Sequence, residues 1–220
     1  MCLSDLHLHT TASDGEPNLQ DVYGYVRRSD IALFSITDRD LPQWIDVPDD
    51  LRAAYVPGVC VSAQFEGRRV DILVYGNIDP HAPLVEALAK QRARRTQRVE
   101  ETVFRLVAAG VVTTIHEVRQ AAGPQCQSFS RMHVVKAMIR SGSLPSVSEA
   151  FRRFLAPKMP AYVPMERLPA RDVVNMAHAA GAIAIASCAR PGPGDLASLQ
   201  RLCAIGIDGI ETRTPSIPLT

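Results

Sequence analysis

The chain has 220 residues, of which 46% are hydrophobic and 21% are charged, and its formal net charge is +1. This size and balance predict one globular domain, or one domain with a large insertion. A net charge so close to zero gives no strong signal for nucleic acid or for a membrane surface. The longest apolar run, within residues 178–188, is far too short to span a bilayer.

The five cysteines are scattered along the chain, and no two of them form a Cys-x-x-Cys motif. This pattern indicates reduced thiols and favours a cytoplasmic protein. Polar residues begin at Asp5 and His7, so the N-terminal segment does not form the apolar core of a signal peptide.

Short apolar runs alternate with helix-length periodic segments, which is typical of parallel β/α construction. The predicted strands are Leu3–Leu8, Ile31–Ile36, Gly58–Ser62, Val70–Tyr75, Ala182–Ala186 and Gly209–Thr212. The predicted helices between them are Leu19–Arg28, Arg171–Ala180 and Leu196–Ile205.

The middle of the chain has a different pattern. From Pro83 to about Leu155 the periodicity is helical, interrupted by glycine and proline, with no strong strand. Four prolines within 157–170 then forbid a continuous helix. We therefore expect a helical insertion at 83–156 within a barrel-like domain that consists of 1–82 and 157–220.

Polar side chains gather where the first three predicted strands end, which in α/β folds is the edge that binds ligands. His7 and His9 are two residues apart in a strand, so they point to the same face and can bind one ion together. Asp14 follows on the next turn and supplies an oxygen ligand. Two histidines and one carboxylate would leave an open coordination position, as catalytic zinc requires.

With these residues in view, the sequence resembles the PHP (polymerase and histidinol phosphatase) family, in particular its stand-alone phosphoesterases of nucleotides and sugar phosphates. The segments DLHLHTTASDG, ALFSITDRD and VPGVCVSAQFEGRRVDILVYG resemble the first three motif regions of the family. The resemblance implies a distorted, TIM-like (β/α)₇ barrel whose active members hold two or three divalent metals. The family's last motif, Ser-Asp-x-His, has no counterpart before Thr220, so a C-terminally shortened barrel is expected.

The resemblance also implies which positions face the metals. They are His7, His9, Asp14, Cys60 and Asp71. The first three match family ligands, whereas Cys60 stands in place of a bridging glutamate and Asp71 in place of a histidine.

Two further family histidines are replaced by Arg39 and Arg190. A guanidinium stays protonated and offers no acceptor, so it cannot ligate a metal. We therefore expect Arg39 to form a salt bridge with Asp14 in place of one ion. Arginine binds phosphate well, so Arg39 and Arg190 are expected to keep a phosphate-binding pocket. The resemblance also implies that Arg131 and His133, which match an Arg-x-His motif of the subgroup's helical insertion, face the substrate phosphate. A helix N-terminal packing pair is the alternative for Arg131 and His133.

These features leave three hypotheses. The first is a degenerate PHP protein with weak or lost phosphoester hydrolysis that keeps a pocket for a phosphorylated small molecule. The second is an active phosphoesterase that uses one divalent ion, zinc or manganese, at His7 and His9. The third is metal-free chemistry at Asp38, Asp40 or Cys188. A shortened barrel would also expose strand edges, which a homodimer would cover.

Overall fold

The structure, a computed structural model, describes residues 3–29, 31–187 and 196–211. A first, two-stranded sheet consists of β1 (Leu3–Leu8) and β2 (Ile31–Ile36), which run parallel. The helix α1 (Leu19–Arg28) connects them and starts with a capping box at Asn18. The buried face of this unit includes Val22 and Phe34, which belong to one hydrophobic cluster. These boundaries confirm the predictions for the first two strands and the first helix.

A second sheet has five strands in the order β5-β3-β4-β6-β7. Their bounds are Leu168–Pro169 (β5), Gly58–Phe65 (β3), Arg68–Tyr75 (β4), Ile183–Ala186 (β6) and Gly209–Ile210 (β7). The pairs β3–β4 and β4–β6 are antiparallel, whereas β3–β5 and β6–β7 are parallel. Parallel construction throughout was therefore the wrong expectation.

The reason lies in the turn between β3 and β4. Glu66 and Gly67 have φ angles of +48° and +75°, and Phe65 pairs with Arg68 across them. Two successive residues with positive φ make the tight hairpin turn that matches the twist of antiparallel strands. No crossover helix is needed there, so the two predicted strands form one hairpin.

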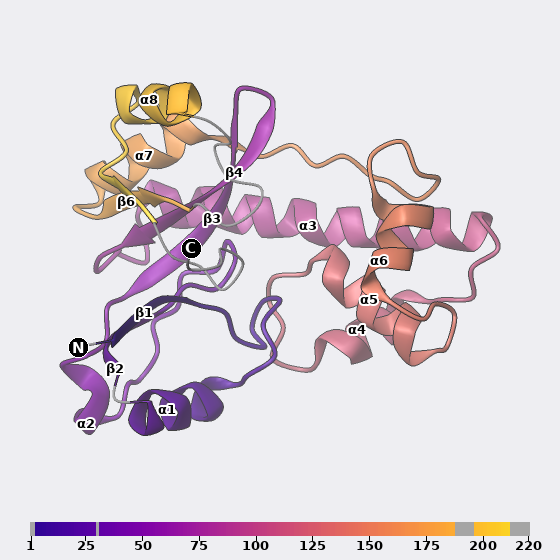
Figure 1. The fold of residues 1–220 in the computed structure, drawn as a ribbon, viewed down its shortest axis with the longest axis horizontal. Helices are drawn as coiled ribbons and strands as arrows, with labels where there is room; N and C mark the ends of the chain where they lie inside the picture. The colour runs from indigo at the N-terminus through magenta and orange to yellow at the C-terminus, as the bar shows by residue number, and fades with distance from the viewer. Residues whose placement is uncertain (1–2, 30, 188–195, 212–220) are drawn as a thin grey trace.

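The main hydrophobic core lies against the five-stranded sheet. The long helix α3 (Pro83–Ala108) and the helix α7 (Ala170–Ala179) cover it, and α8 (Leu196–Ala204) lies near α7 (Figure 1). Fully buried residues such as Val61, Ile72 and Val173 share this cluster. The core fixes the register of β3 and β4, which both carry site residues.

The far half of α3 extends away from the sheets and packs on short helices (Figure 1). These are α4 (Ile115–Ala122), α5 (Arg131–Arg140), α6 (Val147–Ala150) and a π-helix (Phe151–Leu155). They form a separate hydrophobic cluster that includes Leu106, Val118 and Met138. The predicted helical character of 83–155 is confirmed, and the division into a barrel and an insertion stays a prediction.

Two isolated bridges lie between the sheets: Phe34–Tyr55 joins β2 to the segment before β3, and Arg39–Cys60 joins the loop after β2 to β3. The intervening segment 37–57 contains a single short helix, α2 (Asp49–Arg52). The fold is thus a mixed α/β fold, and within the described ranges its strands form two open sheets. The closed (β/α)₇ barrel remains a prediction. None of the described helices combines the length and the apolar character that crossing a membrane would require.

Candidate functional site

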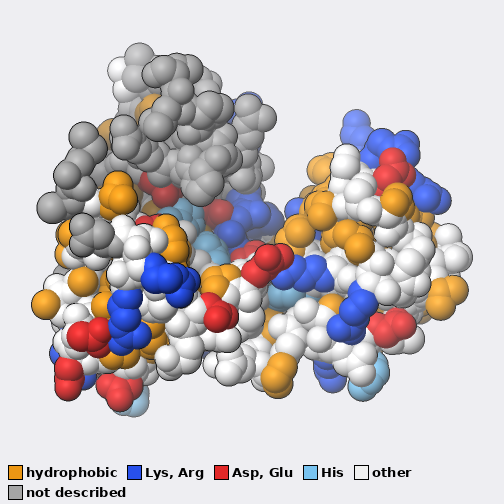
Figure 2. All heavy atoms as spheres, turned by 60° about the horizontal axis from the view of Figure 1, so that its bottom comes forward, with side chains coloured by type: hydrophobic (Ala, Val, Ile, Leu, Met, Phe, Trp, Pro, Cys, Tyr) orange, Lys and Arg blue, Asp and Glu red, His pale blue; other side chains and the backbone are white. Residues whose placement is uncertain are grey.

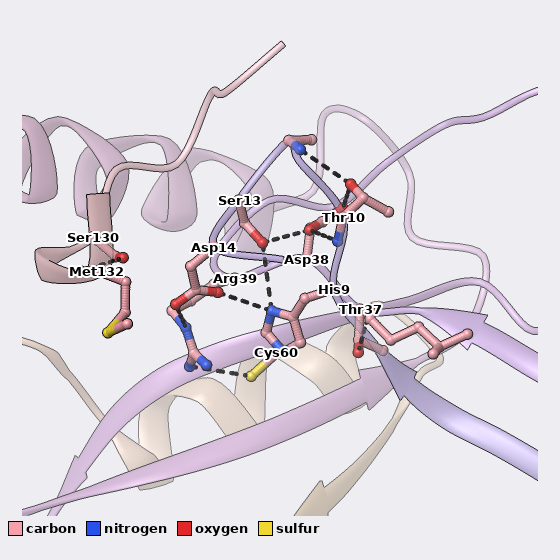
Figure 3. Close-up of polar contacts among 12 residues, drawn as sticks. His9, Thr10, Ser13, Asp14, Thr37, Asp38, Arg39, Cys60, Ser130 and Met132 are labelled. Carbon is pink, nitrogen blue, oxygen red and sulfur yellow. Dashed lines mark hydrogen bonds and ion pairs between the residues drawn. The ribbon is translucent and has the colours of Figure 1, made fainter. Parts of the chain in front are cut away.

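Three segments meet at the junction of the two sheets: the end of β1 with its following turn, the loop after β2, and the middle of the β3–β4 hairpin. The Arg39–Cys60 bridge joins the second segment to the third. His7 lies in β1 and His9 directly follows this strand, and their ring centroids are 5.1 Å apart. Figure 3 shows His9, Asp14, Arg39 and Cys60 converging from these segments.

The first part of this site is the thiol–imidazole group, which consists of His7, His9 and Cys60. One possible ligand atom from each residue lies within 4.8 Å of those of the other two. Cys60 is fully buried, and the two histidines are partly exposed. His7 is oriented by Glu211, whose Oε1 lies 2.9 Å from His7 Nδ1.

The second part is the cationic centre, which consists of Arg39, Asp14 and Asp71. Arg39 Nε donates to Asp14 Oδ2 at 3.0 Å, and Arg39 Nη1 donates to Asp71 Oδ2 at 2.9 Å. The same Nη1 lies 3.6 Å from Cys60 Sγ, so the two parts touch (Figure 3). The predicted salt bridge between Asp14 and Arg39 is confirmed.

The charges of these groups shift one another's ionisation. Burial raises the pKa of Asp14 and of Asp71, but the charge of Arg39, together with His9 beside Asp14 and Arg69 beside Asp71, outweighs burial and holds both pKa values below their usual range. Burial lowers the pKa of His9, and hydrogen bonds to Asp14 and Cys60 outweigh this and raise the pKa of His9 above its ordinary value. The carboxylates therefore stay ionised as partners of Arg39.

The turn after β1 is held by Asp38. Its carboxylate accepts hydrogen bonds from Thr10 N at 2.7 Å and Thr10 Oγ1 at 2.6 Å, and from the Ser13 hydroxyl. A Cβ atom at Gly15 would lie 2.2 Å from His9 O, so only glycine allows the turn to close this tightly. This turn carries Asp14 to Arg39.

Asp40 has a similar supporting role. It adopts a φ of +53°, it is fully buried, and its carboxylate accepts from Ser62 N and from Gln91 Nε2, each at 2.8 Å, and from Arg95. Both oxygens of Asp40, like both oxygens of Asp38, are thus engaged by the protein itself. The structure offers no support for an acid or base role of either residue, and Cys188 lies outside the described residues.

Arg131 and His133 lie at the start of α5. Arg131 Nη1 donates to Leu155 O at 2.9 Å, and its guanidinium stacks 5.0 Å from the Phe151 ring centroid. His133 is buried; its Nδ1 accepts from Ser130 N at 3.1 Å, so its Nε2 donates to Ser13 O at 2.9 Å. Burial also lowers the pKa of His133, in keeping with a neutral ring. Arg131 and His133 thus form the helix N-terminal packing pair that was the alternative expectation, and phosphate binding by these two residues stays a prediction.

Arg190 lies outside the described residues, so its predicted role is not placed. Two contributors were missed from the sequence. Glu211 lies within the predicted strand Gly209–Thr212 and directly follows the observed β7, and its position at a strand end was the available signal. Arg69, which pairs with Asp71 through Nε at 2.9 Å, stands in an exposed-looking hairpin and gave no signal.

The residues can be tested for fit to divalent ions. Arg39 lies in hydrogen-bonding contact with both Asp14 and Asp71, so a cluster of two or three ions using those carboxylates does not fit. The thiol–imidazole group does fit one ion, since nitrogen and sulfur ligands of a tetrahedral zinc are about 3.5 Å apart and a small contraction suffices.

No protein-family model matches the chain. The chain is 29% identical over 209 residues to the 5'-3' exoribonuclease Rnm of Escherichia coli, covering 91% of this chain and 70% of that protein. It is 29% identical over 224 residues to the 3',5'-nucleoside bisphosphate phosphatase of Chromobacterium violaceum, covering 96% of this chain and 77% of that protein.

Solved structures agree in fold. A protein from Chromobacterium violaceum, described as an amidohydrolase with bound sulfate and no metal, superposes with a TM-score of 0.80 at 27% identity, over 94% of this chain and 75% of that one. A protein from Bifidobacterium adolescentis, assigned as a metal-dependent phosphoesterase, gives a TM-score of 0.81 at 23% identity, over 96% and 77%. The chain is thus similar in sequence to a bacterial exoribonuclease and a nucleoside bisphosphate phosphatase, and similar in fold to a phosphoesterase, which agrees with the resemblance seen in the sequence motifs.

Proposed function

We propose that this protein is a degenerate PHP phosphoesterase-like protein that binds a phosphorylated small molecule and has weak or lost hydrolytic activity. The single observation that carries the proposal is the position of Arg39 between Asp14 and Asp71, at 3.0 and 2.9 Å. A permanent cation neutralises the carboxylates that a metal cluster would need. The distorted barrel, the separate helical insertion, the cytoplasmic location and a homodimer belong to this proposal as well.

Metal content and activity test this proposal together. Protein purified without added metals or chelators should contain less than one equivalent of zinc, manganese or iron by elemental analysis. It should hydrolyse p-nitrophenyl phosphate only slightly above background. The variant Arg39→His restores the imidazole that the family resemblance implies, and it should bind more metal than the wild type. Two or more ions per wild-type chain, with steady turnover, would overturn the proposal.

A second candidate function is a phosphoesterase with one metal ion, supported by the thiol–imidazole group. His7, His9 and Cys60 would hold the ion, which would supply a Lewis acid for a phosphoryl oxygen or an activated water. Glu211 would orient His7 through its 2.9 Å contact, as outer-shell carboxylates orient ligating histidines. Loss of hydrolysis in the His9→Ala variant would favour this candidate, and activity unchanged by His7→Ala and His9→Ala would exclude it.

A further inference from the structure

A cavity of about 750 Å³ lies apart from the candidate site, between the loop after β2, the start of β3 and the segment after β4. Its described lining contains no residue of the thiol–imidazole group or of the cationic centre. In Figure 2, Lys and Arg side chains gather beside histidines in the hollow of the surface, whereas the charged residues that line this cavity are two aspartates and one arginine. A volume of this size is typical of small-molecule sites.

The loop that forms one wall of the cavity is held in place, although it lies outside helices and strands. Trp44 Nε1 donates to Ile78 O at 3.1 Å, and this hydrogen bond joins the loop to the opposite wall. Tyr23 Oη donates to Asp46 O at 3.2 Å, and the neighbouring Val47 is buried. The cavity is therefore preformed, so a ligand does not have to order the loop when it binds.

Trp44 supplies an aromatic surface at this cavity. Its indole nitrogen is satisfied by Ile78 O, so the ring is fixed, yet the residue is 56% exposed. Tryptophan is highly buried on average in folded proteins. A tryptophan that is anchored and still half exposed beside a cavity offers a rigid aromatic face that a ligand can cover. Tyr55 adds a second aromatic ring to the lining.

The cavity also has an excess of negative charge. Its charged lining residues are Asp46, Asp79 and Arg52. Arg52 donates from Nε and Nη2 to Asp49 Oδ1, at 3.2 and 3.0 Å, and its Nη2 lies 3.6 Å from Asp46 Oδ1. Asp79 Oδ1 accepts from His81 N at 2.7 Å, and no Lys, Arg or His side chain in the described ranges forms an ion pair with Asp79. The lining therefore favours a positively charged ligand.

We propose that this cavity binds a small organic cation, an ammonium ion that carries alkyl groups. The cation lies on the Trp44 ring, because the face of an indole attracts positive charge. Asp79 directly follows Ile78, which anchors the indole, and supplies the opposite charge. The alkyl groups cover apolar lining residues such as Pro42 and Tyr55, which a bare metal ion would leave uncovered. The inference goes beyond the proposed function, since it holds whether or not the candidate site binds metals or phosphate.

Tryptophan fluorescence tests the inference, because Trp44 is the only tryptophan of the chain and reports on this cavity alone. Titration with choline at constant ionic strength should change the emission along a saturating curve. The neutral isostere 3,3-dimethyl-1-butanol has carbon in place of the charged nitrogen, and its affinity should be at least tenfold lower. A change that rises without saturation, or equal affinity for the two compounds, would refute the inference.

Variants of the lining test the roles of single residues. Asp79→Asn removes the charge and keeps an acceptor for His81 N, so the fold should persist while the affinity for choline falls at least fivefold. Asp172→Asn, at an exposed aspartate of α7 outside the lining, is the matched control and should stay within twofold of the wild type. Trp44→Leu, which lacks the fluorophore, should show no choline binding by calorimetry. Wild-type affinity in either Asp79→Asn or Trp44→Leu would contradict the proposed site.

Discussion

In the cationic centre a guanidinium lies between two carboxylates at 2.9 and 3.0 Å, whereas in the adjacent thiol–imidazole group three uncharged or weakly basic side chains approach one another within 4.8 Å. The two groups share one pocket and touch through Arg39 and Cys60. In the first, Arg39 pairs with both carboxylates, and Arg69 adds a second cation at Asp71. In the second, nitrogen and sulfur atoms of the kind that zinc prefers face one another, and His7 and His9 contact Glu211 and Asp14.

The most severe way to break the cationic centre is Arg39→Met. It leaves Asp14 with His9 and Asp71 with Arg69 as their remaining partners, and removing one partner of a buried pair costs about 3–5 kcal/mol. The free energy of unfolding, measured with urea, should fall by that amount. Arg171→Met, at an exposed position on α7, should change it by less than about 0.5 kcal/mol. An Arg39→Met variant as stable as this control would mean that the ion pairs do not hold the site together.

A second variant acts on the turn that connects the two groups. Gly15→Ala places a Cβ atom 2.2 Å from His9 O, so the turn must open and separate Asp14 from Arg39. Overpacking of this kind costs about 3 kcal/mol. Urea unfolding should show this loss of unfolding free energy. Gly110→Ala is the control that separates packing from backbone conformation. A Cβ atom at Gly110 would have no neighbour within 4 Å, whereas its φ of +80° disfavours any residue other than glycine. A smaller loss at Gly15 than at Gly110 would contradict the predicted steric clash.

Acid titration sharpens the comparison. The folded pKa of Asp71 is depressed, so its contribution to stability is fully present above the ordinary carboxyl pKa of about 4 and is lost as the pH falls below it toward the folded pKa. Roughly 2 kcal/mol should disappear from the free energy of unfolding over this range. The Arg39→Met variant should lose less stability over the same range, because its carboxylates lack the cation. If the free energy of unfolding changed equally with pH in both proteins, Arg39 would not be the group that depresses the pKa of Asp71.

The smallest expected effect concerns the thiol–imidazole group. Cys60→Ser replaces a soft thiol by a poor zinc ligand of similar shape, so zinc affinity should fall by at least about tenfold in a competition assay with a chelating dye. Cys126→Ser should leave affinity unchanged, because Cys126 does not belong to the group. If zinc binds equally to all three proteins, the ion does not use this site.

Much of the fold could be predicted because strand and helix periodicity is a local property. Ile31–Ile36 and Leu19–Arg28 have the predicted bounds. The antiparallel hairpin could not be predicted as easily, because Glu66–Gly67 is a weaker turn signal than Asn-Gly or Asp-Gly, and both residues must still adopt positive φ.

The part of the candidate site that could be predicted consists of residues at the positions of the sequence motifs. The salt bridge between Asp14 and Arg39 followed from the family resemblance, which implies that both positions face one metal, and from the opposite charges of the two residues. The role of Asp40 as an acceptor for Arg95 was not predictable, because that contact joins residues 55 positions apart through the packing of α3 on the sheet.

The contact of His7 with Glu211 joins residues 204 positions apart. During synthesis at about 5–20 residues per second, the first histidine therefore waits roughly 10–40 seconds before the carboxylate that orients it has been made. The N-terminal strand can pair with its neighbour early, but its imidazole cannot reach its final position until residue 211 has left the ribosome. A nascent chain arrested before residue 211 should thus contain the first sheet and still lack the geometry of the thiol–imidazole group.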